Sequence, residues 1–238
     1  GQLPFTVLPG DSYPYADIAS ADGNRFGTLE YDRQGSPRVF LGEPIRHDQL
    51  TVDGEDPGAA IAGRDEATEG AGIQCPSCGA ALQKPADRDV DTLVCQYCGA
   101  QNDLSGAEAR VMGTNPQSFD PGFEFEIGQT FHHDSAPYQV CGRILTQDDE
   151  GYRARQYLLW HPDRGYLYLE EEDGEYVLNQ STLESPQKDP FSLDEGEQIS
   201  VGKRKYRFIE DGTSTIRYVD GALPWKAATD DRSKYADF

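Results

Sequence analysis

Two Cys-x-x-Cys pairs constrain what this chain can fold into more than any other feature. The pairs are Cys75-Pro-Ser-Cys78 and Cys95-Gln-Tyr-Cys98, and a Gly-Ala dipeptide follows each of them. This C-x2-C-x16-C-x2-C spacing is typical of a zinc ribbon, in which each short knuckle supplies two thiolates to one tetrahedral ion. The glycine after each knuckle tolerates a positive φ, which lets backbone amides turn back toward the sulfurs. The sequence therefore predicts a structural Zn2+ held by all four cysteines, with no coordination position left for a substrate.

Two other uses of this segment are less favoured. A redox-active Cys-x-x-Cys is expected inside a βαβ pattern, which the flanking sequence lacks. Asp87, Asp89 and Asp91 lie between the knuckles at the spacing of a calcium loop. The sixth position of that loop is Thr92 where glycine is needed, and the twelfth is Cys98 where glutamate is needed. We therefore expect no calcium site between the knuckles.

The charge balance restricts the classes of partner. Asp and Glu number 42 against 21 Lys and Arg, for a formal net charge of -21. Phosphate contacts require clustered Lys and Arg, so nucleic acid and anionic lipid are not expected partners. No run of 18 apolar residues is present, so no membrane span is predicted in this chain. The five cysteines form an odd set without a visible secretory signal, which favours a reducing, cytoplasmic location.

Composition divides the chain into segments. Residues 53–72 contain six acids, five glycines and no aromatic residue, so they are interpreted as a flexible acidic linker. The linker separates an N-terminal piece, residues 1–52, from the Cys-rich ribbon at residues 73–104. Residues 105–122 are a connector, in which the capping box of Ser105 and Glu108 predicts a short helix. Residues 123–238 follow as a larger domain.

That larger domain has the pattern of an antiparallel β-meander. Short aromatic and aliphatic runs alternate with turns such as Glu172-Asp-Gly and Glu210-Asp-Gly. Ser181–Glu197 lacks this periodicity and is expected to be a surface loop. The predicted fold class is therefore mainly β, with an antiparallel meander beside a four-cysteine zinc ribbon. The meander is expected to close into a small barrel, with a sandwich or a strongly bent sheet as the alternatives. The runs expected to form strands are Tyr138–Leu145, Arg155–Trp160, Gly165–Leu169, Glu175–Leu178, Lys205–Ile209 and Thr215–Val219.

The two ends of the chain resemble each other at one constant offset. GQLPF near the start matches GALPW near the end, and YADI matches YADF, with 220 residues between matching positions in both cases. A constant offset across both halves of a motif indicates an internal repeat. Residues 1–52 would then be the C-terminal part of a preceding repeat copy, and residues 123–238 an incomplete second copy. The alternative is that two similar hairpin ends occur within one domain.

The remaining candidate residues favour structural roles. His132 and His133 are adjacent, so on an extended segment they point to opposite faces and do not share a metal. Cys141 lies in an apolar strand and is expected to be a small buried hydrophobe. The acidic run from Glu170 to Glu175 surrounds a hairpin turn, where a solvated face is favoured over a cation or polyamine contact. The basic residues Lys203–Arg207 are expected on an exposed strand that discourages edge pairing.

A family resemblance appears when these motifs are read in order. The knuckles, then Ile127-Gly, Tyr138-Gln-Val-Cys-Gly-Arg and Gly221-Ala-Leu-Pro-Trp, resemble bacterial proteins in which a zinc ribbon precedes domain of unknown function 4178. The resemblance implies ribbon-plus-domain copies in tandem and only the four ribbon cysteines as functional residues. It also implies an association with polyamine-synthesis-like enzymes and small membrane proteins. The chain departs from the family pattern at Arg155, where a Trp is usual in that region.

These observations predict a non-enzymatic, zinc-stabilised interaction or scaffold module of a bacterial multi-protein system. No motif of a named enzyme class is found. The expected partners are proteins, including membrane-associated ones, with tethering to the inner face of the membrane through regions outside this chain. A homo-oligomer, or exchange of residues 1–52 between chains, is a further expectation. The alternatives are a small-ligand domain that binds polyamines or other cations, and an uncharacterised enzyme.

Overall fold

The fold is mainly β with almost no helix, which confirms the predicted class. The computed structural model describes residues 13–20, 26–31, 37–45, 51–52, 72–172, 174–182, 186–208 and 210–237. Among these residues one short 3-10 helix, η2 (Pro190–Ser192), interrupts the strands. None of the helical structure described is long and apolar enough to cross a membrane. The predicted linker, apart from Gly72, and the GQLPF half of the repeat lie outside the described residues.

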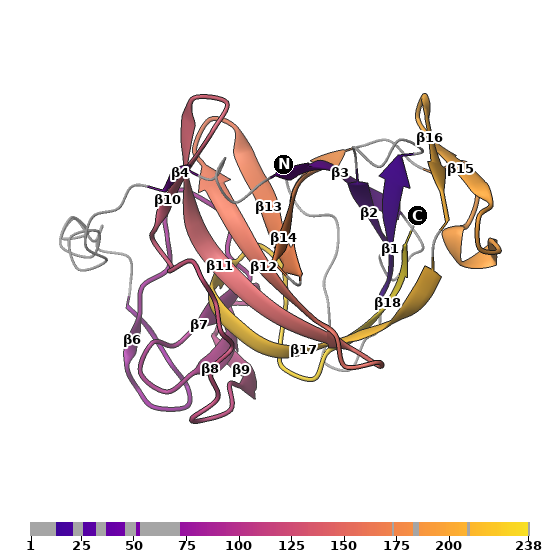
Figure 1. The fold of residues 1–238 in the computed structure, drawn as a ribbon. Helices are drawn as coiled ribbons and strands as arrows, with labels where there is room; N and C mark the ends of the chain where they lie inside the picture. The colour runs from indigo at the N-terminus through magenta and orange to yellow at the C-terminus, as the bar shows by residue number, and fades with distance from the viewer. Residues whose placement is uncertain are drawn as a thin grey trace.

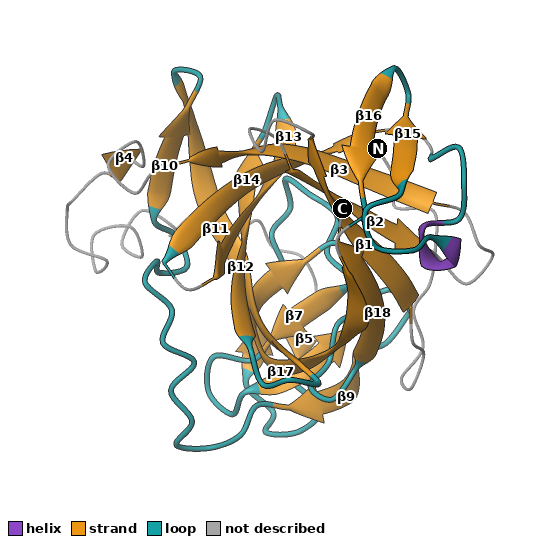
Figure 2. Cartoon of the chain, turned by 45° about the vertical axis from the view of Figure 1, so that its right-hand side comes forward, coloured by secondary structure: helices purple, strands orange, loops and turns teal. Residues whose placement is uncertain are grey.

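Hydrogen-bonded strands form a closed ring, which includes strands from residues 1–52 beside those of the predicted meander (Figures 1 and 2). The ring closes because β11 pairs with both β12 and β17. Neighbouring strands are antiparallel except for β1 and β18, which are parallel. In order around the ring the strands are β11 (Ala136–Asp148), β12 (Arg153–His161), β13 (Gly165–Glu172), β14 (Glu175–Thr182), β3 (Pro37–Ile45), β2 (Phe26–Tyr31), β1 (Tyr13–Ser20), β18 (Arg232–Asp237) and β17 (Glu210–Leu223).

The alternation of side chains along β12 and β13 builds a core on each face of this part of the sheet. Tyr157 and Leu159 pack in one cluster with Leu167 and Leu169, under a cover that includes Phe125. The other face carries Leu158 in a second cluster, which reaches the ribbon through Val94 and β17 through Val219. Because successive residues of a strand point to opposite faces, this alternation fixes the register of the meander.

Part of the ribbon continues the sheet of the barrel. β5 (Ile73–Gln74) and β6 (Ala81–Leu82) pair with each other in a separate two-stranded sheet. β7 (Thr92–Val94) and β8 (Ala100–Asp103), with β9 (Arg110–Thr114) of the connector, extend the sheet of the barrel. β7 pairs with the end of β17, where Leu93 lies opposite Ala222 and Thr92 lies opposite Leu223. The ribbon is therefore joined to the barrel by backbone hydrogen bonds as well as by side chains.

The helix predicted after Ser105 is wrong. Residues 105–108 form bends, and β9 follows as a strand paired with β8. The capping box is too weak a signal here because Gly106 disfavours a helix and the free edge of β8 offers backbone partners. Asp103 instead accepts hydrogen bonds from the amide and hydroxyl of Ser105, which uses the capping side chain in a turn.

Shorter strands pair with the barrel outside the ring. β4 (Thr51–Val52) pairs with β10 (Thr130–His133), and β10 forms a hairpin with β11. β15 (Gln198–Val201) and β16 (Arg204–Arg207) form a projecting hairpin whose second strand pairs with β1. The segment Ser181–Glu197, expected to be a loop, begins with the end of β14 and contains η2.

The constant offset found in the sequence recurs in the pairing of two strands. β1 and β18, which contain the two Tyr-Ala-Asp sequences, lie side by side and parallel. Their register places Tyr13 opposite Ser233, Pro14 opposite Lys234, and Asp17 opposite Asp237. Each of these pairs is separated by 220 residues, the offset found in the sequence.

Candidate metal centre

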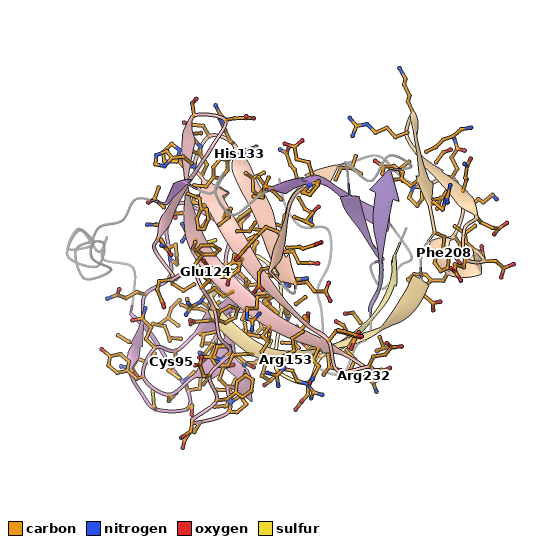
Figure 3. All side chains as sticks on the ribbon, viewed as in Figure 1. Cys95, Glu124, His133, Arg153, Phe208 and Arg232 are labelled. Atoms are coloured by element: carbon orange, nitrogen blue, oxygen red, sulfur yellow. The ribbon has the colours of Figure 1, made fainter. Side chains whose placement is uncertain are left out.

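The four knuckle cysteines converge on one point. Cys75 and Cys78 follow β5, and Cys95 and Cys98 lie between β7 and β8. The Sγ atoms of Cys75 and Cys98 are 3.7 Å apart, as are those of Cys78 and Cys95. All four sulfurs lie within 4.8 Å of one another. Figure 3 shows Cys95 in the lobe formed by the ribbon, well away from His133.

The two knuckles have the same backbone geometry. The amide of Gly79 donates to the carbonyl of Cys75 at 2.8 Å, and the amide of Gly99 donates to that of Cys95 at 2.9 Å. Both glycines have positive φ, +77° and +71°, as their place after each knuckle predicted. This turn brings the amide of the following alanine toward the second sulfur of each pair. The repeated Cys-x-x-Cys-Gly-Ala sequence therefore makes two equivalent knuckles, each of which presents two thiols to the same point.

The sulfur cluster has the dimensions that a tetrahedral zinc ion requires. A Zn–S bond of about 2.3 Å places sulfurs at the corners of a tetrahedron about 3.8 Å apart. The two measured separations of 3.7 Å agree with that edge length. Cys75 and Cys95 are buried, while Cys78 is exposed, so one side of the cluster faces solvent. Four thiolates fit Zn2+ in chemistry and in spacing, and they would hold it as a structural ion.

Backbone amides prepare one thiol for metal binding. The amide of Ala100 is the largest influence on Cys98 and lowers the pKa of its thiol to about 7. The amide of Ala80 acts in the same direction on Cys78, but the other cysteines, Cys98 first, raise the pKa of this thiol to about 12. The metal-free cluster therefore shares its protons among neighbouring sulfurs, and a cation displaces them when it binds.

A buried ion pair fastens the ribbon to the loop after β17. The ammonium of Lys226 lies 2.8 Å from a carboxylate oxygen of Asp103, and their side chains are 7% and 17% exposed. The hydroxyl of Thr92 donates to the carbonyl of Trp225 at 2.7 Å and accepts from the amide of Ala227 at 2.9 Å. These contacts fix β7 and β8 against residues that follow more than 120 positions later.

A second clamp is made of buried amides. Gln101 donates to Asn115 at 2.8 Å, and Asn115 in turn donates to the carbonyl of Val219 and accepts from its amide. The amide of Thr229 donates to Gln101 at 3.0 Å. The sequence analysis did not single out any of these residues. Their partners lie far away along the chain, so no local pattern identifies them.

The other predicted residues lie apart from the cluster. Cys141 is buried and donates to the carbonyl of Leu158 at 3.4 Å, as expected of a small core residue. Burial raises the pKa of its thiol to about 12. His132 and His133 occupy adjacent positions of β10, and Nε2 of His133 lies 3.5 Å from Asp134. The carboxylate of Asp87 accepts hydrogen bonds from the guanidinium of Arg88 and from the indole N–H of Trp160, the second at 3.0 Å.

The acidic run is not uniformly solvated, which corrects one prediction. Glu172 and Glu175 are exposed, as expected. Glu171 is buried and pairs with Arg155 at 2.8 Å, because the alternation of β13 turns its side chain into the core. Glu170 is partly buried and accepts from Gln156 at 3.0 Å, and desolvation raises the pKa of its carboxyl.

The basic cluster is exposed, as predicted, on the hairpin of β15 and β16. Lys203, Arg204, Lys205 and Arg207 are all exposed, whereas Tyr206 is buried in a small core beneath the hairpin. Arg204, the first residue of β16, is exposed although it and the buried Tyr206 are two positions apart on the strand.

Comparison with known families covers only the C-terminal part of the chain. Residues 126–238 match the family described as Domain of unknown function (DUF4178). The matched region contains β10 to β18 and excludes both the cysteine cluster and β1 to β3. No curated protein and no solved structure matches the chain.

Proposed function

We propose that the protein is a non-enzymatic, zinc-stabilised interaction module. The observation that carries the proposal is the closed cluster of four thiols on a ribbon clamped to the barrel. Four thiolates satisfy tetrahedral Zn2+ completely, so the ion would support structure and leave no position for a reacting molecule. The zinc ion would then hold the knuckles rigid, and the clamped ribbon would hold them in a fixed place on the barrel.

An exposed aromatic residue supports the proposal that one side of the ribbon contacts a partner. Tyr97, inside the second knuckle, is 80% exposed, the most exposed of the large hydrophobic residues described. Aromatic residues are enriched at the centres of protein interfaces because they bury a large area at a small cost in conformational entropy. We expect the partners to be cytoplasmic or membrane-associated proteins, recognised through the knuckle surface.

Metal analysis combined with affinity capture tests this role. The purified chain should contain one zinc per molecule by mass spectrometry of the metal. After brief cross-linking in the native host, Tyr97→Ala should lose the captured proteins that the unaltered chain retains. Tyr152→Ala is the matched control, because Tyr152 is also exposed, at 55%, but lies at the turn before β12. Equal capture by Tyr97→Ala and the unaltered chain would reject the knuckle as the contact surface.

A second candidate role, the binding of a polyamine or another organic cation, rests on Glu170. Loss of water on burial raises the pKa of its carboxyl, and the hydrogen bond that it accepts from the neutral Gln156 offsets this only in part. A bound amine would supply a compensating charge. Spermidine titration by calorimetry tests it: saturable binding that persists at high salt and disappears in Glu170→Gln favours the ligand role. Binding that is unchanged in Glu170→Gln, or screened by salt, would reflect only the acidic surface.

A further inference from the structure

The hairpin of β15 and β16 carries a cluster of unpaired positive charges. Lys203, Arg204, Lys205 and Arg207 are all exposed and lie close together along the chain. Among the residues that the structure describes, no ion pair involves any of these side chains. The chain as a whole has 42 acidic residues against 21 basic ones, so the cluster departs from the overall charge balance.

Basic residues elsewhere in the described part of the chain do pair with the surplus acids. Those in ion pairs with a carboxylate are Arg88, Arg143, Arg155, Arg217, Lys226 and Arg232. Acids also lie near the hairpin: the amide of Gly196 donates to the carbonyl of Phe208 at 2.9 Å, and Glu195 and Glu197 on either side of it are exposed. The charges of the hairpin therefore remain unpaired although acids are close to its base.

Protection of a sheet edge explains only part of this charge. β16 pairs with β15 through all of its residues, and Arg207 also lies opposite Ala19 of β1. Arg207 is thus flanked by a strand on each side, and no free edge remains there for a charge to block. Its exposed charge is therefore available for another role.

The hairpin holds its cations in a fixed outward arrangement. Tyr206 is buried in a small core, whose other buried members are Leu193, Ile199, Val201 and Phe208. Because successive residues of a strand point to opposite faces, this anchor directs Lys205 and Arg207 outward. The hairpin projects from the barrel, and Phe208 at its base lies far from Cys95 in the ribbon (Figures 1 and 3).

We propose that Lys203, Arg204, Lys205 and Arg207 bind an acidic, extended segment of a partner protein. Lys205 and Arg207 are two positions apart on β16, a distance of about 7 Å along the strand. Carboxylates on alternate residues of an extended peptide repeat at the same distance. Hydrogen bonds between charged groups are roughly twice as strong as neutral ones. Acidic segments are already extended in solution because their charges repel one another, so binding requires little further ordering.

The hairpin lacks what other polyanions require. Binding to an anionic membrane surface combines charge with inserted apolar groups, and single-stranded nucleic acid stacks on exposed aromatic rings. The exposed large hydrophobic residues among those described are Tyr97, Val111 and Tyr152, and none of them lies on this hairpin. A long polyanion would extend past the hairpin and meet the surplus acids, whereas charges beyond about 8 Å are screened from a short segment at physiological salt. A short acidic peptide is therefore the polyanion that this surface fits best.

Fluorescence anisotropy with a labelled peptide of eight glutamates tests the proposal in the full-length, zinc-loaded chain. The NaCl concentration is about 0.1 M, so that charges more than about 10 Å away are largely screened. We expect saturable binding that weakens about tenfold or more in the triple variant Lys203→Gln/Lys205→Gln/Arg207→Gln, because three charge contacts are lost. Lys203→Arg combined with Lys205→Arg keeps the charges and should keep the binding.

A matched control removes the same number of charges elsewhere. The triple variant Lys84→Gln/Arg110→Gln/Arg164→Gln replaces exposed cations in the ribbon, in β9 and in the turn before β13. It has the same net charge as the hairpin variant and should bind the peptide within about twofold of the unaltered chain, since distant charges are screened. Thermal unfolding of both variants checks that the fold is retained.

Four results would overturn the proposal. The first is no saturable binding of the peptide, and the second is equal binding by the hairpin variant and the unaltered chain. The third is an equal loss in the matched control, which would reflect net charge alone. The fourth is tighter binding of oligothymidylate, or of vesicles of phosphatidylserine and phosphatidylcholine, that the hairpin variant loses; this would assign the surface to another polyanion.

The proposed knuckle contact is independent of this surface. Tyr97→Ala leaves β15 and β16 unaltered and should bind the glutamate peptide as the unaltered chain does. Failure of the knuckle contact and failure of the hairpin site are therefore distinguishable.

Discussion

Lys226 is buried, and its charge is compensated by Asp103. Burial alone would raise the pKa of the Asp103 carboxyl, but the hydrogen bonds from Lys226 and Ser105 outweigh it and lower that pKa. At the scale of single residues, this pair rather than the many surface carboxylates connects the ribbon with the barrel. Replacing one partner leaves the other desolvated without its counter-charge.

We expect Asp103→Asn to lower the free energy of unfolding by about 1–3 kcal/mol at pH 7. The pKa of Asp103 is lower in the folded state than in the unfolded state. Its contribution to the free energy of unfolding is therefore fully present above the unfolded-state pKa of about 4, and it is lost as pH falls through the folded-state pKa. Urea denaturation at pH 7 and toward pH 4 measures the difference between the two proteins. Zinc content is checked at each pH, and a difference that does not shrink on acidification would contradict the ion-pair explanation.

The cysteine cluster gives a second prediction at this scale. Cys95→Ser removes a buried ligand and should abolish stoichiometric zinc binding. Loss of the ion is expected to cost at least about 3 kcal/mol, which lowers Tm by about 6–12 °C in a chain of this size. Cys141→Ala is the control, because Cys141 is equally buried but lies outside the cluster. Retention of zinc by Cys95→Ser would show that the four sulfurs do not act as one site.

At the scale of elements, β17 joins the parts of the molecule. It pairs with β11 to close the ring, with β18, and with β7 of the ribbon. Gly221 lies where the pairing passes from the barrel to the ribbon, opposite Gly142, and has φ of +77°. A Cβ at position 221 would collide with the carbonyl oxygen of Cys141. The close approach of two backbones at this point therefore requires glycine.

Gly221→Ala should accordingly be far more costly than a glycine substitution of similar backbone geometry. Gly174 has φ of +83°, but open space surrounds its Cβ position. We expect Gly174→Ala to cost about 1 kcal/mol from the backbone alone, and Gly221→Ala about 2–4 kcal/mol because the clash adds to it. Thermal unfolding of the two variants gives the comparison. Equal losses would mean that the strands separate without strain at Gly221.

At the scale of the whole molecule, charge opposes compactness. The net charge of -21 is carried by a chain of 26.3 kDa, and folding brings these acids closer together. Like charges destabilise the compact state by mutual repulsion, which salt screens over about 10 Å at 0.1 M.

Stability should therefore rise with ionic strength. We expect Tm, measured by calorimetry at pH 7, to increase by several degrees between about 0.02 and 0.5 M NaCl. Sodium chloride is used because it separates screening from the stronger surface exclusion of sulfate. A Tm that falls with NaCl would indicate that local pairs such as Arg155 with Glu171 outweigh the overall repulsion.

The sequence by itself determined the features that depend on neighbours along the chain. The knuckles could be predicted because two thiols and a glycine within one turn are a local geometry. The mainly antiparallel fold could be predicted because alternation and turn residues are also local signals. The same local reasoning failed at Ser105, where a weak helix signal competed with the free edge of β8.

Only the tertiary structure decided how these parts are joined. Three kinds of contact connect residues more than 100 positions apart, which no local pattern pairs. They are the pairing of β7 with β17, the buried ion pair of Lys226 with Asp103, and the hydrogen bonds of the Gln101 and Asn115 side chains. The sequence revealed that β1 and β18 share a Tyr-Ala-Asp sequence at an offset of 220 residues, but the fold decided that they lie in register as neighbours. The physical reason is that backbone edges and buried polar groups accept any partner of the right geometry, and only the packed chain determines which partner reaches them.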